Sequence, residues 1–318
     1  MDSPRTFAKV KKSRAQDFIK SINGKNLMDN NYKIIHNGDF VYFPLLDGIK
    51  VDEETVSLVP EKNERKPTPR GHSGAFDVIG DIAIIRERKD GNASNIVDFI
   101  KNTRKNIRAI YIDHGVDGEF RLRDLEFVYG DDNPETVHRE NGIMLWLNVK
   151  NVYFSPRLAT ERMIIAGKVR ENENILDMFC GAGPFTITIM KNHNVSVIAL
   201  DKNPEAIRAL EKNFSLNKIK GNLKTRVCDS WEEIKHIVNM DRIIMNNPTS
   251  RKVDFELIRN SLKTNGTVNF YEINSTEGIA ERMESFRREG FMPVNKRIVH
   301  GYSKTSSMVS MEFRRERQ

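Results

Sequence analysis

Four strand-like segments in the second half of the chain each end in, or are followed by, an acid or an amide. These residues are Asp177, Asp201, Asp229 and Asn246. Ligands of open parallel sheets bind outside the carboxyl ends of the strands, so the four side chains are expected to converge there. Asp201, at the end of the second strand, is placed to accept both hydroxyls of a ribose. A carboxamide such as Asn246 can orient a planar base by its polar edge. Together they predict a nucleoside site.

The turn after the first of these segments contains two glycines. Residues 174–184 read Asn-Ile-Leu-Asp-Met-Phe-Cys-Gly-Ala-Gly-Pro, which indicates a strand, a glycine turn and the start of a helix. Gly181 and Gly183 can adopt positive φ and let the backbone approach a ligand closely. Thr186 stands where the dinucleotide fingerprint has its third glycine, so the turn suits a nucleoside without phosphates better. The alternative is a tight connection that binds nothing, and the acid at position 201 argues against it.

S-adenosylmethionine fits this set of parts. The glycine turn would hold its methionine portion, Asp201 its ribose and Asp229 its adenine amino group, and Asn246 would lie beside its methyl group. Asn-Pro sequences also end strands in many unrelated proteins. The role of Asn246 is therefore inferred from its position at the last of the four strand ends, and not from the Asn-Pro pair. The residues expected to contact the cofactor are Asp177, Phe179, Gly181, Gly183, Phe185, Asp201, Lys202, Asp229 and Asn246.

Alternating strands and helices must position these residues. Strand-like segments lie at 174–180, 195–200, 223–229, 241–246 and 267–273, with two more at 294–300 and 308–313. Helical patterns such as 204–216 lie between them. The alternation predicts an α/β fold, a Rossmann-like domain with a doubly wound, mostly parallel sheet.

Two small α/β units are expected before that domain. The predicted boundaries are 1–53 for the first unit, 54–71 for a linker, 72–150 for a middle domain packed on the catalytic domain, and 151–318 for the Rossmann-like domain. In the first unit the spacing predicts a helix over 8–22, and Asn37-Gly38 between strand-like runs predicts a hairpin. Residues 76–85 of the middle domain are interpreted as one strand. Ser155 and Pro156 are expected to cap and begin a helix.

Composition narrows the function classes. The net charge is +7 and the isoelectric point about 9.2, which favours a polyanionic partner, although a mildly basic surface is the simpler explanation. No segment of about 18 apolar residues occurs, so no membrane span is predicted. Two cysteines without metal-ligand spacing, and an N-terminus without a signal pattern, predict a cytoplasmic protein without a metal.

The sequence resembles the archaeal and eukaryotic-type tRNA (guanine(37)-N(1))-methyltransferases over nearly its whole length. The matching stretches are Gly118-Glu-Phe-Arg121, residues 135–142, Val152-Tyr-Phe-Ser-Pro-Arg-Leu-Ala-Thr-Glu-Arg162, Asp177-Met-Phe-Cys-Gly-Ala-Gly-Pro-Phe185 and Ile243-Ile-Met-Asn-Asn-Pro248. The third stretch is the most specific. The resemblance implies methyl transfer from S-adenosylmethionine to guanosine 37 of tRNA, a tRNA-binding first domain, no obligate protein partner and a monomer.

The resemblance also implies roles for residues. Guanine N1 carries a proton that must be removed, and charge develops on O6. Glu161 would be the general base and Arg121 would donate to O6, with Asn246 as a third catalytic residue. The pocket for the flipped base would be formed by Tyr153, Arg157, Asn246 and Pro248. No metal is implied.

The residues alone leave simpler explanations open. Arg157 and Glu161 have the i,i+4 spacing of a helix surface pair. Arg121 and Arg123 alternate in a strand-like run, as two solvated bases would, and Tyr153 has the character of a core residue. Two departures from the family pattern, Asn247 and Cys180, affect the base pocket and the glycine turn.

Three other functions compete with this one. A wyosine-pathway transferase would move the aminocarboxypropyl group, or methylate a wyosine intermediate, on the same nucleotide. An RNA-binding protein with an inactive cofactor pocket would lack catalysis, which intact Glu161, Asp201 and Asn246 argue against. An adenine-N6 methyltransferase would be expected to carry an aromatic residue after Pro248, where this chain has Thr249.

Overall fold

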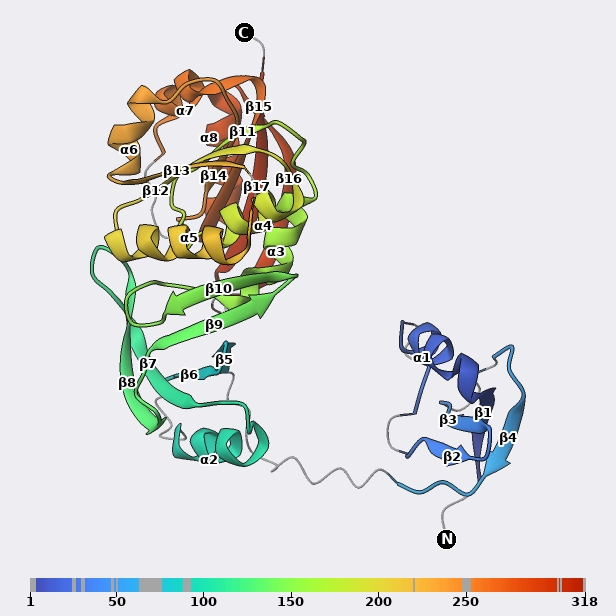
Figure 1. Cartoon of the computed structure of the whole chain (residues 1–318). Helices are drawn as coiled ribbons and strands as arrows, with labels where there is room; N and C mark the ends of the chain where they lie inside the picture. The colour runs from blue at the N-terminus through green and yellow to red at the C-terminus, as the bar shows by residue number, and fades with distance from the viewer. Residues whose placement is uncertain are drawn as a thin grey trace. The chain divides into compact units, whose positions relative to one another are not determined.

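The computed structural model forms two compact units, Met1–His72 and Ser73–Gln318, and each is described by itself (Figure 1). The residues that the structure describes are 4–24, 27–29, 32–46, 49, 51–62, 76–87, 93–219, 221–247, 253–301, 303 and 305–316. None of the helices in these segments is long and apolar enough to cross a membrane.

The first unit is a four-stranded sheet with one helix. The strand order is β2-β3-β1-β4. The elements are β1 (Arg5–Lys11), the 3-10 turn η1 (Lys12–Arg14), α1 (Ala15–Gly24), β2 (Ile35–Asn37), β3 (Phe40–Pro44) and β4 (Thr55–Leu58). The hairpin predicted at Asn37-Gly38 is confirmed, with Gly38 at a φ of 57° between β2 and β3. Phe18 packs on Phe43 in the core, with ring centroids 5.3 Å apart.

Two expectations for this unit are corrected. The helix predicted from residue 8 is wrong up to residue 14, because Ala8 and Val10 alternate with Lys9 and Lys11 as the inner and outer faces of β1. The linker predicted from residue 54 is wrong for β4, which pairs with β1 at Ala8↔Thr55. Residues 63–71 of the predicted linker lie outside the described residues.

The middle part of the second unit has two small sheets. The strand orders are β5-β6-β7-β8 and β10-β9. The elements are β5 (Phe76–Ile79), β6 (Ile82–Arg86), α2 (Ala93–Thr103), β7 (Ala109–Asp117), β8 (Leu122–Gly130), β9 (Glu135–Glu140) and β10 (Ile143–Asn148). The single strand predicted over 76–85 is instead a hairpin, because Gly80 turns the chain at a φ of 59°. The long β7–β8 hairpin ends in a turn at residues 118–121.

The rest of the second unit is built on a seven-stranded sheet of order β13-β12-β11-β14-β15-β17-β16 (Figure 1). Its strands are β11 (Asn174–Asp177), β12 (Ser196–Asp201), β13 (Asn222–Val227), β14 (Met240–Met245), β15 (Leu262–Asn274), β16 (Phe291–Gly301) and β17 (Ser307–Arg315). The first five strands of that order are parallel, and β17 is antiparallel to both of its neighbours. The predicted α/β fold with a Rossmann-like, mostly parallel sheet is confirmed.

Helices cover both faces of this sheet. They are η2 (Pro156–Leu158), α3 (Ala159–Ala166), α4 (Pro184–Asn192), α5 (Pro204–Leu216), α6 (Ser230–Glu233), η3 (Ile234–His236), α7 (Phe255–Ser261) and α8 (Thr276–Arg288). Successive residues of β11 face opposite cores, since Ile175 joins the cluster with α3, α4 and α5 and Leu176 joins the cluster with α7 and α8. Pro156 begins η2 as predicted, but the Ser155 side chain makes no capping hydrogen bond. Residues that follow β11, β12, β13 and β14 therefore meet at one edge of the sheet.

Candidate active site

A pocket of about 480 Å³ lies where this edge of the sheet meets the tip of the β7–β8 hairpin. The predicted residues on its wall are Arg121, Tyr153, Arg157, Phe179, Gly181, Asp201, Lys202, Asp229 and Asn246. Four others, Glu161, Asp177, Gly183 and Phe185, are buried behind the wall or in the turn beside it. Pro248 lies outside the described residues. In the described segments, no group of three or more His, Cys, Asp or Glu side chains could hold a metal.

Asp201 holds the glycine turn against the second strand. Its Oδ2 accepts a hydrogen bond from the Gly181 backbone N–H at 2.8 Å, and its Oδ1 accepts one from the Asn203 N–H at 2.9 Å. Burial raises the pKa of Asp201, and these backbone donors oppose that shift. A carboxylate has about four acceptor positions, so Asp201 keeps acceptor capacity beyond these backbone donors.

Asp177 and Gly183 support the turn from behind. Asp177 is 2% exposed and accepts a hydrogen bond from the Thr186 hydroxyl at 2.8 Å. Burial raises the pKa of Asp177 to about 7, although the Thr186 hydrogen bond opposes the shift. Gly183 has a φ of 79°, and a Cβ there would lie 2.1 Å from Leu210 Cδ1. Its lack of a side chain therefore lets α5 pack closely against the turn.

The pKa of Asp177 leads to a prediction for the free chain. The folded-state pKa of about 7 exceeds the reference value of 3.8, so the contribution of Asp177 to stability falls as pH rises from about 4 to 7 and is level above 7. Asp177→Asn cannot ionise at this position. The melting temperature of the variant minus that of the wild type should therefore increase as pH rises through this window, as calorimetry without cofactor would measure. A difference in melting temperature that does not change with pH would contradict the assignment.

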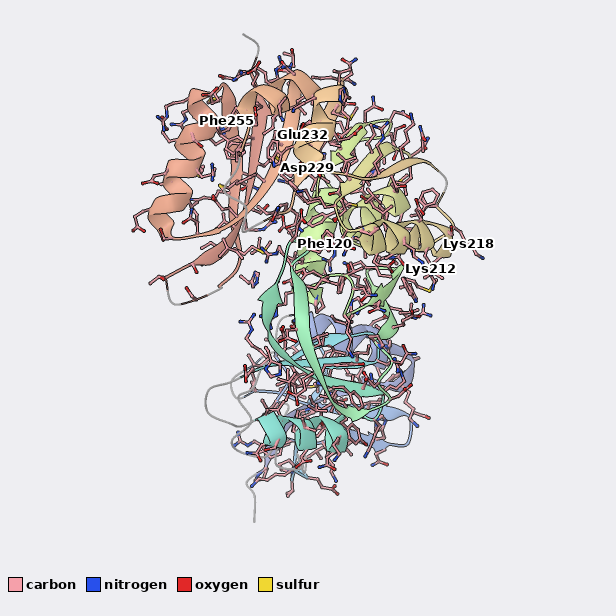
Figure 2. All side chains as sticks on the ribbon, turned by 90° about the vertical axis from the view of Figure 1, so that its left-hand side faces the viewer. Phe120, Lys212, Lys218, Asp229, Glu232 and Phe255 are labelled. Atoms are coloured by element: carbon pink, nitrogen blue, oxygen red, sulfur yellow. The ribbon has the colours of Figure 1, made fainter. Side chains whose placement is uncertain are left out.

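A chain of charges joins the hairpin tip to the sheet edge. Lys202 Nζ lies 3.0 Å from Glu119 Oε1 and 2.9 Å from Asp229 Oδ2. The hydrogen bond from Lys202 lowers the pKa of Asp229, whose Oδ1 also caps α6 at the Trp231 N–H. Phe120, 40% exposed, stands at the end of the same hairpin and lines the pocket (Figure 2). The hairpin thus forms one side of the pocket mouth.

Arg121 and Tyr153 form another part of the wall. The Tyr153 ring is 40% exposed, and the guanidinium carbons of Arg121 and Arg123 lie 5.9 and 5.2 Å from its centroid. Arg121 has a φ of 54°, a left-handed conformation that is unfavourable for a residue with a Cβ. No described carboxylate pairs with its guanidinium. Tyr153 is therefore a pocket residue and not part of the core.

The neighbouring arginines are committed to carboxylates. Arg123 pairs with Asp113 at 2.7 Å and with Asp77 at 3.3 Å, and it also donates to the Phe154 carbonyl. Arg157 donates to Asp77 Oδ1 at 2.9 Å. The alternative of an Arg157–Glu161 surface pair is therefore wrong, and so is that of Arg123 as a solvated base.

Glu161 lies on α3, is 2% exposed and is not among the residues that line the pocket. Tyr271 Oη donates to its Oε1 at 2.9 Å, and Arg297 of β16 pairs with its Oε2. Tyr271 and Arg297 both lie opposite Ser310 across the sheet. Two positions further along β15 and β17, the row of Ile273, Met308 and His300 lines the pocket. Both oxygens of Glu161 are thus occupied by protein partners.

Two residues of the wall, Asn246 and His300, each have a buried polar atom without a hydrogen-bond partner among the described residues. The atoms are Asn246 Oδ1 and His300 Nδ1. Sequence reasoning selected Asn246 but missed His300, Phe120, Asp77 and Arg297. Asp77 and Arg297 become recognisable only through partners on distant elements, and no motif marks His300. Phe120 lies within the Gly118-Glu-Phe-Arg121 stretch that matches the family, but the resemblance implies a role only for Arg121 of that stretch.

Family models match three successive segments of the chain. Residues 9–53 match the tRNA methyltransferase 5 N-terminal domain, residues 58–133 the TYW2 N-terminal domain, and residues 136–292 the TRM5/TYW2 methyltransferase domain.

Individual proteins match over most of their length. The chain is 37% identical over 310 residues to tRNA (guanine(37)-N(1))-methyltransferase Trm5b of Pyrococcus abyssi, covering 90% of this chain and 92% of that protein. It is 33% identical over 230 residues to tRNA (guanine(37)-N(1))/4-demethylwyosine(37)-methyltransferase Taw22 of Nanoarchaeum equitans, covering 70% and 76%. The crystal structure of Trm5b from Pyrococcus abyssi superposes with a TM-score of 0.70 at 32% identity, covering 98% and 99%. The complex of aTrm5 with tRNALeu gives 0.68 at 27% identity, covering 98% and 100%.

Proposed function

The chain belongs to the TRM5/TYW2 methyltransferase family and uses S-adenosylmethionine, and on that premise we propose that it methylates N1 of guanosine 37 in tRNA. One observation carries the proposal. A single pocket brings the guanidinium of Arg121 and the open ring of Tyr153 to the strand ends that carry Asp201 and Asn246. A donor for an oxygen, a flat surface for a base and a nucleoside-binding edge are what the reaction needs.

One end of the pocket is proposed to bind the cofactor and the other the target base. Asp201 keeps acceptor capacity for ribose hydroxyls beside its backbone donors, and Asp229 lines the pocket beside Lys202. The cofactor supplies an electrophilic methyl group on its sulfonium. Asn246 Oδ1, buried after β14 and without a partner among the described residues, orients the target base by a donor on its edge. Asp177, Gly183 and Phe185 act indirectly, by fixing the turn that carries Gly181.

Arg121 stabilises the negative charge on guanine O6, and Glu161 removes the proton from guanine N1. Arg121 donates to guanine O6, where negative charge develops as N1 loses its proton. Glu161 accepts that proton and becomes a neutral carboxylic acid, while N1 bonds the methyl group and the sulfonium becomes a thioether. For this, Arg297 must release Oε2, because protein partners occupy both Glu161 oxygens.

Wyosine-intermediate methylation is the second candidate. The Nanoarchaeum equitans relative is named for both guanine-37 and 4-demethylwyosine-37 methylation. A larger tricyclic base would use the same wall of Tyr153 and Asn246. The two activities are separable by substrate.

Methyl transfer from labelled S-adenosylmethionine, followed by nucleoside analysis, tests the function. Unmodified tRNA with G37 should yield 1-methylguanosine, and the same tRNA with A37 should yield no product. Incorporation of label from the aminocarboxypropyl carbon into a wyosine precursor would assign the chain to the other branch of the family. Bound cofactor without any product would contradict both assignments.

The first unit is proposed to bind tRNA away from the anticodon. Lys9 lies 4.8 Å from the Phe40 ring centroid, and Lys11, Lys12 and Arg14 are exposed beside it. Deleting residues 1–62 should raise KM for full-length tRNA about tenfold or more, because phosphate contacts are lost. The KM for S-adenosylmethionine is the internal control, and an anticodon stem-loop should be used equally well by both forms. Unchanged kcat/KM on full-length tRNA would overturn this role.

A further inference from the structure

The carboxylate of Glu161 depends on partners from two other elements. Tyr271 of β15 is 0% exposed and donates to Oε1, while the Arg297 side chain of β16 is 33% exposed and pairs with Oε2. Burial and the nearby Glu161 raise the pKa of Tyr271 well above its usual range, so Tyr271 stays a neutral donor. Arg297 is therefore the cation that compensates this buried carboxylate.

Other cations on and beside α3 are paired elsewhere. Arg162 donates to both oxygens of Glu140 at 2.6 Å, and Arg157 donates to Asp77. Lys168, which follows α3, pairs with Glu312. None of these can replace Arg297 without breaking its own pair.

A buried carboxylate without a cation takes up a proton, because desolvation disfavours its charged form. A protonated Glu161 cannot accept the N1 proton of guanine. The cation beside Glu161 is therefore what compensates its charge in this buried position, and the Arg297 side chain reaches solvent while that of Glu161 does not.

We propose that Arg297 is a positioning residue, which keeps Glu161 ionised behind the pocket wall and releases its Oε2 when the target base is in place. The proposal rests on the proposed function, in which Glu161 is the base. Arg297 itself touches neither the base nor the cofactor. It lies opposite Ser310 of β17, two positions from Met308, which lines the pocket with Ile273 and His300.

The pH profile of kcat tests the proposal. Arg297→Met should move the acid limb to higher pH by about one unit or more, so that activity falls about tenfold at about pH 6 and recovers at about pH 9. Arg297→Lys should keep most of the wild-type profile. Tyr271→Phe should shift the limb in the same direction but less. A uniform loss at all pH values, or no change, would overturn the proposal.

Arg259→Met is the matched control for loss of an arginine. Arg259 pairs with Glu289 at 3.1 Å, and neither residue lines the pocket. This variant should leave the pH profile of kcat unchanged. A shift equal to that of Arg297→Met would mean that any lost arginine alters the profile, and would refute a specific role.

A stability cycle separates this inference from the proposed function. Arg297→Met should lower the melting temperature at about pH 8 by several degrees, and Glu161→Gln in the same chain should restore most of it. Suppose that the wild type makes no 1-methylguanosine, but Glu161→Gln restores the melting temperature of Arg297→Met. The Arg297–Glu161 pairing is then supported and the assigned reaction is wrong. If 1-methylguanosine forms but neither the cycle nor the pH profile responds, the reaction stands and the role of Arg297 fails.

Discussion

Replacing Glu161 by glutamine is expected to lower kcat for methylation of G37 by about a hundred- to ten-thousand-fold, the usual contribution of a general base. Glutamine keeps the shape and can still accept from Tyr271, but it cannot take up the N1 proton. The loss should be in kcat, because Glu161 lies behind the pocket wall and contributes little to binding. Single-turnover assays with saturating tRNA and cofactor measure it.

Glu173→Gln is the matched control for this change. Glu173 is also largely buried and pairs with an arginine, Arg242, at 3.0 Å, but it lies before β11 at the opposite end of the sheet from the pocket. It should alter stability and leave kcat within a few-fold of the wild type. If Glu161→Gln retained wild-type kcat, the proton would have to leave N1 by another route.

The second large effect is expected at Arg121. Arg121→Ala should reduce kcat by about a hundred- to a thousand-fold, because the oxygen that gains charge loses its donor. The KM for S-adenosylmethionine should change little, since Asp201 and Asp229, not Arg121, are the residues proposed to bind the cofactor. Arg121→Lys should recover only part of the rate, because an ammonium does not reproduce the planar guanidinium.

Arg121→Gly separates the chemistry from the fold. The φ of 54° at this position is costly for arginine and free for glycine. The glycine variant should therefore melt at or above the wild-type temperature while it loses activity as Arg121→Ala does. An inactive variant that is also much less stable would indicate that Arg121 serves the hairpin and not the reaction.

The parallel sheet and its polar edge are predictable because their signals are local. Strands β11, β12, β14 and β15 each contain a short apolar run, and Asp201, Asp229 and Asn246 stand at or just after strand ends. The alternation of strands and helices therefore places them at one edge. β1 also has a local strand signal, but the helical pattern that follows it in the sequence led to a wrong prediction. The alternation of Ala8 and Val10 with Lys9 and Lys11 has period two, yet the lysine-rich segment continues into a helical pattern and is predicted as part of it.

The side walls of the pocket cannot be predicted in this way, because they come from contacts between distant segments. Arg297 and Glu161 are 136 residues apart, and Asp77 and Arg157 are 80 residues apart. The i,i+4 spacing makes Arg157 the obvious partner of Glu161, and tertiary packing gives each of them a different one. The placement of Asp177 and Gly183 behind the wall likewise depends on how α4 and α5 pack on the turn.

The charges at the pocket mouth have a kinetic consequence. Glu119, Lys202 and Asp229 are well exposed, and such pairs are weak and screened by salt. They hold the tip of the β7–β8 hairpin against the sheet edge only loosely. Spent cofactor must leave through this mouth, so its release should become faster as ionic strength rises. Higher salt would therefore weaken tRNA binding and speed up cofactor exchange. Because these two effects act on turnover in opposite directions, turnover would be fastest at an intermediate salt concentration.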